Sequence, residues 1–130
     1  MLLFGHPFIA SERFYHVEDV DMIFHTPSNS TLYAEFNEAS LELFEHMQKN
    51  SLNYAVKVAD VEELIYAESL GATYIIVGSD LAKNGQKIAE NYLFDAKILV
   101  EIEDKKEIEV MAYEGIDGVI FPNAIIHVNS

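Results

Sequence analysis

Three charged side chains stand inside otherwise apolar runs of the sequence, where a charge is costly. Glu35, Lys57 and Glu101 each occupy the next-to-last position of a short run typical of a β-strand. A buried charge must be paired, neutralised or reached by water. If these side chains meet, Lys57 can form a Schiff base or act as a base, and a glutamate can shuttle protons. The three are therefore the candidate catalytic residues.

A structural interpretation of the same charges competes with the catalytic one. Charged residues also occur inside strands where an ion pair only stabilises the sheet. A strand at the edge of a sheet can also expose one of its faces to water. No recognisable catalytic signature accompanies Lys57 or the two glutamates. For Glu35, Lys57 and Glu101 we therefore favour the structural ion pair.

A second candidate site lies where an apolar run turns into a helical pattern, at Gly78, Ser79 and Asp80. Free backbone N–H groups at such a turn can hold a phosphate. The segment matches neither GxGxxG nor the Walker pattern, and Asp80 would repel an anion, so a helix cap is the simpler interpretation. Asn123 follows the last strand, at the same predicted edge. These four residues are the candidate ligand-binding residues.

The five histidines show no metal-binding spacing. None forms an i, i+4 pair or an HxH motif, and the chain has no cysteine. We expect surface or turn histidines, no metal and no cofactor. The histidines are His6, His16, His25, His46 and His127.

The elements that must position these residues alternate along the chain. Helical patterns separate the apolar runs and start near Asn37, Asp60, Asp80 and Glu107. Such alternation is typical of βαβ units with right-handed crossovers and a parallel sheet. The expected strands are 32–36, 53–58, 73–77, 97–102 and 118–121.

The fold class that this alternation favours is α/β: a three-layer α/β/α sandwich with a mainly parallel five-stranded sheet in a single domain, 1–130. Residues 31–124 form its core. Residues 1–30 are expected to be an irregular extension with one extra strand near 14–17 and a short helix that turns Phe24 inward. The alternative is a half (β/α)8 barrel completed by dimerisation, since a whole barrel needs roughly 200–250 residues.

One segment carries a family resemblance. Gly115–Pro122 is a strand that ends in Phe-Pro, and the stretch 53–124 around it resembles part of a small phosphate-binding (β/α) barrel of the 2-keto-3-deoxy-6-phosphogluconate aldolase type. That family's Schiff-base lysine stands three residues before the proline, where this chain has Val119. The resemblance therefore implies a fold and not the aldolase chemistry.

Composition excludes several classes of protein. The 130 residues suit one domain, and half of them are hydrophobic, which is too many for a disordered tail. A charge of −14 is repelled by phosphate backbones, so we expect no nucleic-acid partner. No apolar stretch approaches the roughly 20 residues of a membrane span, and no signal peptide is evident. Together with the absence of cysteine, this predicts a cytoplasmic protein without a membrane partner.

Two functions remain from the sequence. We favour a non-catalytic interaction or regulatory domain that forms a homo-oligomer through its N-terminal aromatic segment. The alternative is a small-molecule-binding protein or lyase-like enzyme that uses the Lys/Glu cluster at the strand carboxyl ends. The aromatic segment contains Phe4, Phe8, Phe14 and Tyr15.

Overall fold

The computed structural model describes residues 1–128, which form one sheet of eight strands. The strand order is β1-β7-β6-β5-β4-β3-β2-β8, and every neighbouring pair is parallel. The strands are β1 Leu2–Phe4, β2 Phe14–His16, β3 Thr31–Glu35, β4 Tyr54–Lys57, β5 Tyr74–Val77, β6 Lys97–Glu101, β7 Gly118–Ile120 and β8 Ile125–His127.

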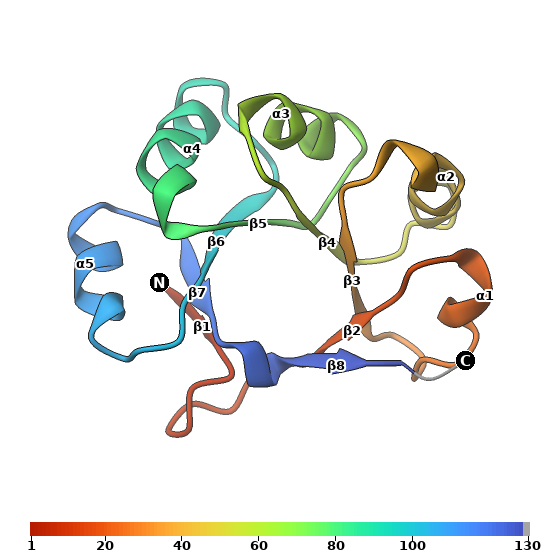
Figure 1. Ribbon diagram of the computed structural model, residues 1–130, viewed down its shortest axis with the longest axis horizontal. Helices are drawn as coiled ribbons and strands as arrows, with labels where there is room; N and C mark the ends of the chain where they lie inside the picture. The colour runs from red at the N-terminus through yellow and green to blue at the C-terminus, as the bar shows by residue number, and fades with distance from the viewer. Residues whose placement is uncertain (129–130) are drawn as a thin grey trace.

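Helices connect most of the strands and all lie outside the curled sheet (Figure 1). Asp60 caps one of them: its side chain accepts from the Glu63 N–H at 2.9 Å, while Glu63 accepts from Ala59, a reciprocal pattern like the one predicted. The helices are α1 Val20–Ile23, α2 Leu41–Lys49, α3 Val61–Ser69, α4 Ser79–Asn91 and α5 Glu107–Tyr113, with 3-10 turns η1 Glu38–Ser40 and η2 Pro122–Ala124.

The sheet curls around a buried apolar centre. The rings of Phe4 on β1 and Phe14 on β2 lie 5.0 Å apart, although five strands separate β1 from β2 in the sheet order. η2 joins β7 to β8, which pairs with β2, so the chain itself bridges the two ends of the sheet. The concave cluster consists of Phe4, Phe14, Tyr33, Ala55, Ile76, Leu99, Ile120 and Ala124.

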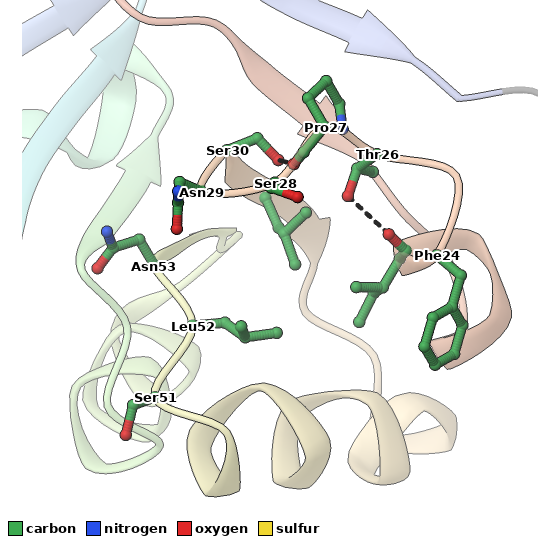
Figure 2. A pocket seen from close by; sticks show the side chains of 11 residues that line it. Phe24, Thr26, Pro27, Ser28, Asn29, Ser30, Ser51, Leu52 and Asn53 are labelled. Atoms are coloured by element: carbon green, nitrogen blue, oxygen red, sulfur yellow. Dashed lines mark hydrogen bonds between the residues drawn. The ribbon is translucent and has the colours of Figure 1, made fainter.

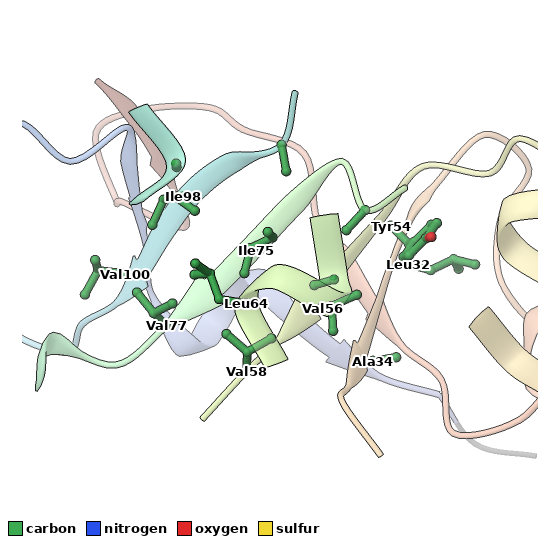
Figure 3. Close-up of a cluster of buried hydrophobic side chains, with 14 of the residues drawn as sticks. Leu32, Ala34, Tyr54, Val56, Val58, Leu64, Ile75, Val77, Ile98 and Val100 are labelled. Atoms are coloured by element: carbon green, nitrogen blue, oxygen red, sulfur yellow. The ribbon is translucent and has the colours of Figure 1, made fainter. Parts of the chain in front are cut away.

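The convex face of the sheet packs against the helices. Because side chains alternate along a strand, the neighbours of the concave residues point outward and form a second buried cluster under α2 to α5. Leu64 of α3 is completely buried in it, as are Phe44 and Met47 of α2. Figure 3 shows the part built by Leu32, Ala34, Tyr54, Val56, Val58, Leu64, Ile75, Val77, Ile98 and Val100.

The predicted α/β class with a parallel sheet is confirmed, but two finer expectations are wrong. The sheet has eight strands instead of five, and helices cover only its convex face, so it is not the middle layer of a sandwich. Aromatic side chains such as Phe4 and Phe14 fill the concave face, which leaves no room there for a helix layer. The alternative half-barrel fits in part, because the sheet is curled.

The first thirty residues contribute more to the sheet than expected. Both β1 and β2 belong to it, and β1, which pairs with β7, was not predicted. The short helix is present as α1, but Phe24 follows it and is 75% exposed, so the prediction that it points inward is wrong. No helix within residues 1–128 is both long enough and apolar enough to cross a membrane.

Candidate functional site

The candidate site is the mouth of the curled sheet, at the carboxyl ends of its strands. Lys57 ends β4 and Glu101 ends β6. Each lies two residues after a concave-cluster residue, Ala55 and Leu99, and therefore faces the same side of the sheet. Lys57 Nζ donates to Glu101 Oε2 at 2.6 Å across the intervening strand β5, and the two side chains are 28% and 29% exposed. The ion pair is thus close and only partly hydrated.

Glu35 lies at the same mouth. It ends β3, pairs in register with Lys57 and is exposed. Its position two residues after Tyr33 puts it on the concave side as well. The structure therefore brings together all three residues that the sequence singled out. Lys57 is ion-paired with Glu101, and Glu35 lies on β3, the strand next to that of Lys57.

Tyr33, which the sequence analysis did not select, lies beneath these charges. Burial raises the pKa of its phenol, and the negative charges of Glu101 and then Glu35 raise it further, so the hydroxyl stays protonated at neutral pH. Among residues 1–128 this hydroxyl has no hydrogen-bond partner, yet no side-chain polar atom there is both buried and unpartnered. The Tyr33 side chain is 5% exposed, so its hydroxyl lies at the base of the mouth with little contact to solvent.

Two histidines complete the mouth on its other side. His16 ends β2 and His127 ends β8, and the two residues pair in register. Their Nδ1 atoms are 3.4 Å apart, and the His16 ring meets the Tyr33 ring edge-on at 5.0 Å. Their separation of 111 positions along the chain hides this pair from any spacing motif. The only available signal was that both follow an apolar residue at i−2, as Lys57 and Glu101 do.

The second predicted site is the turn that contains Gly78, Ser79 and Asp80. The turn is a helix cap, as favoured, but the cap residue is Gly78; Asp80 lies in the first turn of α4 and makes no side-chain capping bond. Asp80 Oδ1 would instead lie 2.8 Å from a Cβ added at Gly78, so its carboxylate covers the turn where an anion would sit. Ser79 is the first residue of α4. The Asp80 carboxylate thus offsets the positive end of the α4 helix dipole at this turn.

Asn123, the fourth predicted ligand-binding residue, bonds the backbone of another loop. It lies in η2, and its Nδ2 donates to the backbone oxygen of Gly5 at 3.0 Å. Gly5 has a φ of +84°, and a Cβ there would come within 2.9 Å of Asn123 Oδ1. Asn123 thus fastens the loop between β1 and β2.

Two cavities of similar size lie at opposite ends of the sheet. One, of about 370 Å³, lies beside the mouth and is lined by His16, Glu18 and Glu35 among others. The other, of about 380 Å³, lies before β3 and β4, and no charged side chain lines it; Asn29 and Asn53 are among its walls (Figure 2). Only the first cavity shares residues with the candidate site.

Within residues 1–128 no three histidine or acidic side chains are grouped to hold a metal ion. Val119, at the position of the aldolase lysine, is completely buried in the convex cluster. No protein-family model matches the chain, and the search of curated proteins also found no match. The aldolase-type resemblance thus stays a prediction.

Proposed function

We propose that this protein binds a small molecule bearing hydroxyl or amino groups at the mouth of its curled sheet. The observation that carries the proposal is the 2.6 Å contact between Lys57 and Glu101, with Tyr33 and Glu35 beside it. Ligand sites of parallel α/β sheets gather at the carboxyl ends of the strands, where these residues lie. The mouth combines fixed charges with the neutral phenol of Tyr33 beneath them.

The chemistry of the mouth determines which ligand suits it. Glu35 and Glu101 accept hydrogen bonds from hydroxyl or ammonium groups, while Lys57 and the neutral Tyr33 donate. Because Lys57 is ion-paired to Glu101, it serves as an ammonium donor and not as a free amine nucleophile. Non-covalent binding is therefore favoured over lyase-like chemistry through a Schiff base.

A thermal-shift screen of polar metabolites followed by calorimetry tests this proposal. We expect ligands to be found whose affinity falls at least tenfold in Lys57→Met and in Glu101→Gln, because each substitution removes a group that meets the ligand. Lys83→Met, an exposed lysine on α4, is the matched control and should bind like the parent. Ligands that bind Lys57→Met as tightly as the parent would contradict the proposal.

The lyase-like alternative has its own test. Borohydride added in the presence of carbonyl metabolites should trap no adduct on Lys57, because an imine requires the uncharged amine. Mass spectrometry of the treated protein would detect the adduct. A trapped adduct that disappears in Lys57→Met would establish covalent chemistry at this mouth.

A second candidate function is the non-catalytic homo-oligomer, and the N-terminal loop supports it. Phe8 is 80% exposed and its neighbour Ile9 is exposed as well, whereas Phe4 and Phe14 lie in the concave cluster. Exposed apolar side chains on one loop are typical of contact surfaces. Light scattering after gel filtration should then give a dimer mass that falls to the monomer mass in Phe8→Ser. A monomeric parent would exclude this candidate.

A further inference from the structure

His16 and His127 form a pair that the proposed small-molecule site does not use. β8 is the last strand of the sheet order, and β2 is its one neighbour in that order. The two histidines stand directly opposite each other in this pairing, on the edge strand β8 and its neighbour β2. Both imidazoles are therefore held by backbone pairing and not by a flexible loop.

The separation of the two nitrogens distinguishes a hydrogen bond from a metal site. Hydrogen bonds donated by nitrogen usually span about 2.7–3.2 Å, so 3.4 Å between the Nδ1 atoms is long for one. Two imidazole ligands of a tetrahedral ion, each about 2.0–2.1 Å from it, are about 3.3–3.4 Å apart. The same geometry puts the ring centres about 5 Å apart, close to the 5.4 Å between His16 and His127.

We infer that the Nδ1 atoms of His16 and His127 bind one divalent transition-metal ion of the kind that prefers imidazole, such as Zn²⁺ or Ni²⁺. Water fills the remaining positions of the ion. Glu18 and Glu35 line the cavity beside His16, and the chain carries a charge of −14, so the local field attracts a cation. This inference does not rest on the proposed small-molecule site.

The bound ion would join β8 to β2 by a link in addition to their short ladder. Each strand is only three residues long, and β8 is the last element of the described chain. An ion that binds the folded protein and not the unfolded chain raises the stability of the folded state. The metal would thus secure the end of the sheet next to the mouth.

Thermal melting with added metal tests the inference. Zn²⁺ or Ni²⁺ at about a hundred times its Kd should raise the Tm by about 5–10 °C. His16→Asn and His127→Asn should each abolish the rise, because one imidazole alone binds weakly. His25→Asn, an exposed histidine just after α1, should keep it. Mg²⁺, which prefers oxygen ligands, should leave the Tm unchanged at equal ionic strength.

Calorimetry keeps the test independent of variant stability, and circular dichroism checks that each variant folds. We expect one Zn²⁺ per chain. An equal rise with Mg²⁺, an unchanged Zn²⁺ effect in both variants, or no Zn²⁺ binding to the parent would overturn it. We expect the Lys57→Met variant to bind Zn²⁺ like the parent, which would show that the metal site is independent of the proposed small-molecule site.

Discussion

The two ends of the curled sheet use the same residue types in opposite ways. At the amino end, Glu12 accepts hydrogen bonds from Thr31 at 2.6 Å and from the Tyr74 hydroxyl at 3.0 Å. At the carboxyl end, Glu101 bonds Lys57, while the Tyr33 hydroxyl has no partner among residues 1–128. At the first end a glutamate and a tyrosine are bonded to each other, whereas at the second end the glutamate is paired with a lysine and the tyrosine hydroxyl bonds no residue within 1–128.

This difference separates scaffold from candidate function. Glu12, in the loop before β2, binds residues at the starts of β3 and β5 and so ties the loop to the sheet. Glu35 and Lys57, at the ends of their strands, are partly or largely exposed. Polar groups that satisfy one another stabilise the fold, and those that reach solvent are free to meet another molecule. The comparison therefore predicts large stability effects at the amino end and small ones at the mouth.

The largest effect is expected at Phe14, which is completely buried against Phe4 and Tyr74. Phe14→Ala should lower the free energy of unfolding by about 3–5 kcal/mol, because it leaves a cavity in the concave cluster. His16→Ala, on the same strand and the same face but at the mouth, should cost less than about 1 kcal/mol without metal. Urea denaturation measures both. Equal losses of unfolding free energy in the two variants would contradict the predicted difference between the amino and carboxyl ends of the sheet.

The α/β alternation was predictable, but the curl was not. Buried parallel strands such as β5 and β6 are uniformly apolar in a flat sandwich and in a curled sheet alike, so their sequences do not distinguish the two. The strands at the two ends of the sheet order, β1 and β8, have three residues each, and Pro122 before β8 resembles a stop signal. Neither segment follows a helical pattern, and that context is what revealed β7, which is equally short.

The candidate site could be predicted in part, for a reason that Lys57 illustrates. A charge near the end of an apolar strand must leave the core at the carboxyl edge, where parallel strands bring their ends together. That rule selected Glu35, Lys57 and Glu101. It could not select Tyr33, whose hydrophobic ring suits a core, or the pair of His16 with a residue at the far end of the chain.

Glu12 offers the next largest effect. Glu12→Ala leaves the buried Thr31 hydroxyl without its acceptor and removes the partner of Tyr74, and should cost about 1–3 kcal/mol. Glu35→Ala is the matched control at the mouth and should change stability by less than about 0.5 kcal/mol. Chemical denaturation of the two variants gives the values. A Glu35 variant less stable than the Glu12 variant would reverse the comparison.

Alkaline pH tests the amino end through Tyr74. Burial, the charge of Glu12 and the hydrogen bond to it raise the pKa of Tyr74 to about 12. Above pH 10 the unfolded chain releases this proton while the folded protein retains it, so stability is full below pH 10 and is lost towards pH 12. The loss should be about 1–2 kcal/mol after allowance for solvent screening. A Tyr74→Phe variant should lose less over the same range, and an unchanged loss would contradict this role.

The smallest effect, and the sharpest test, compares the two tyrosines directly. Tyr74→Phe removes a hydrogen bond to a carboxylate and should cost about 1–2 kcal/mol. Tyr33→Phe removes a hydroxyl that bonds no residue within 1–128, and should change stability by less than about 0.5 kcal/mol. The Tyr33 variant should nevertheless bind a mouth ligand about tenfold more weakly, since its hydroxyl would meet the ligand. A Tyr33 variant that loses stability but not affinity would mean that both ends of the sheet serve only the fold.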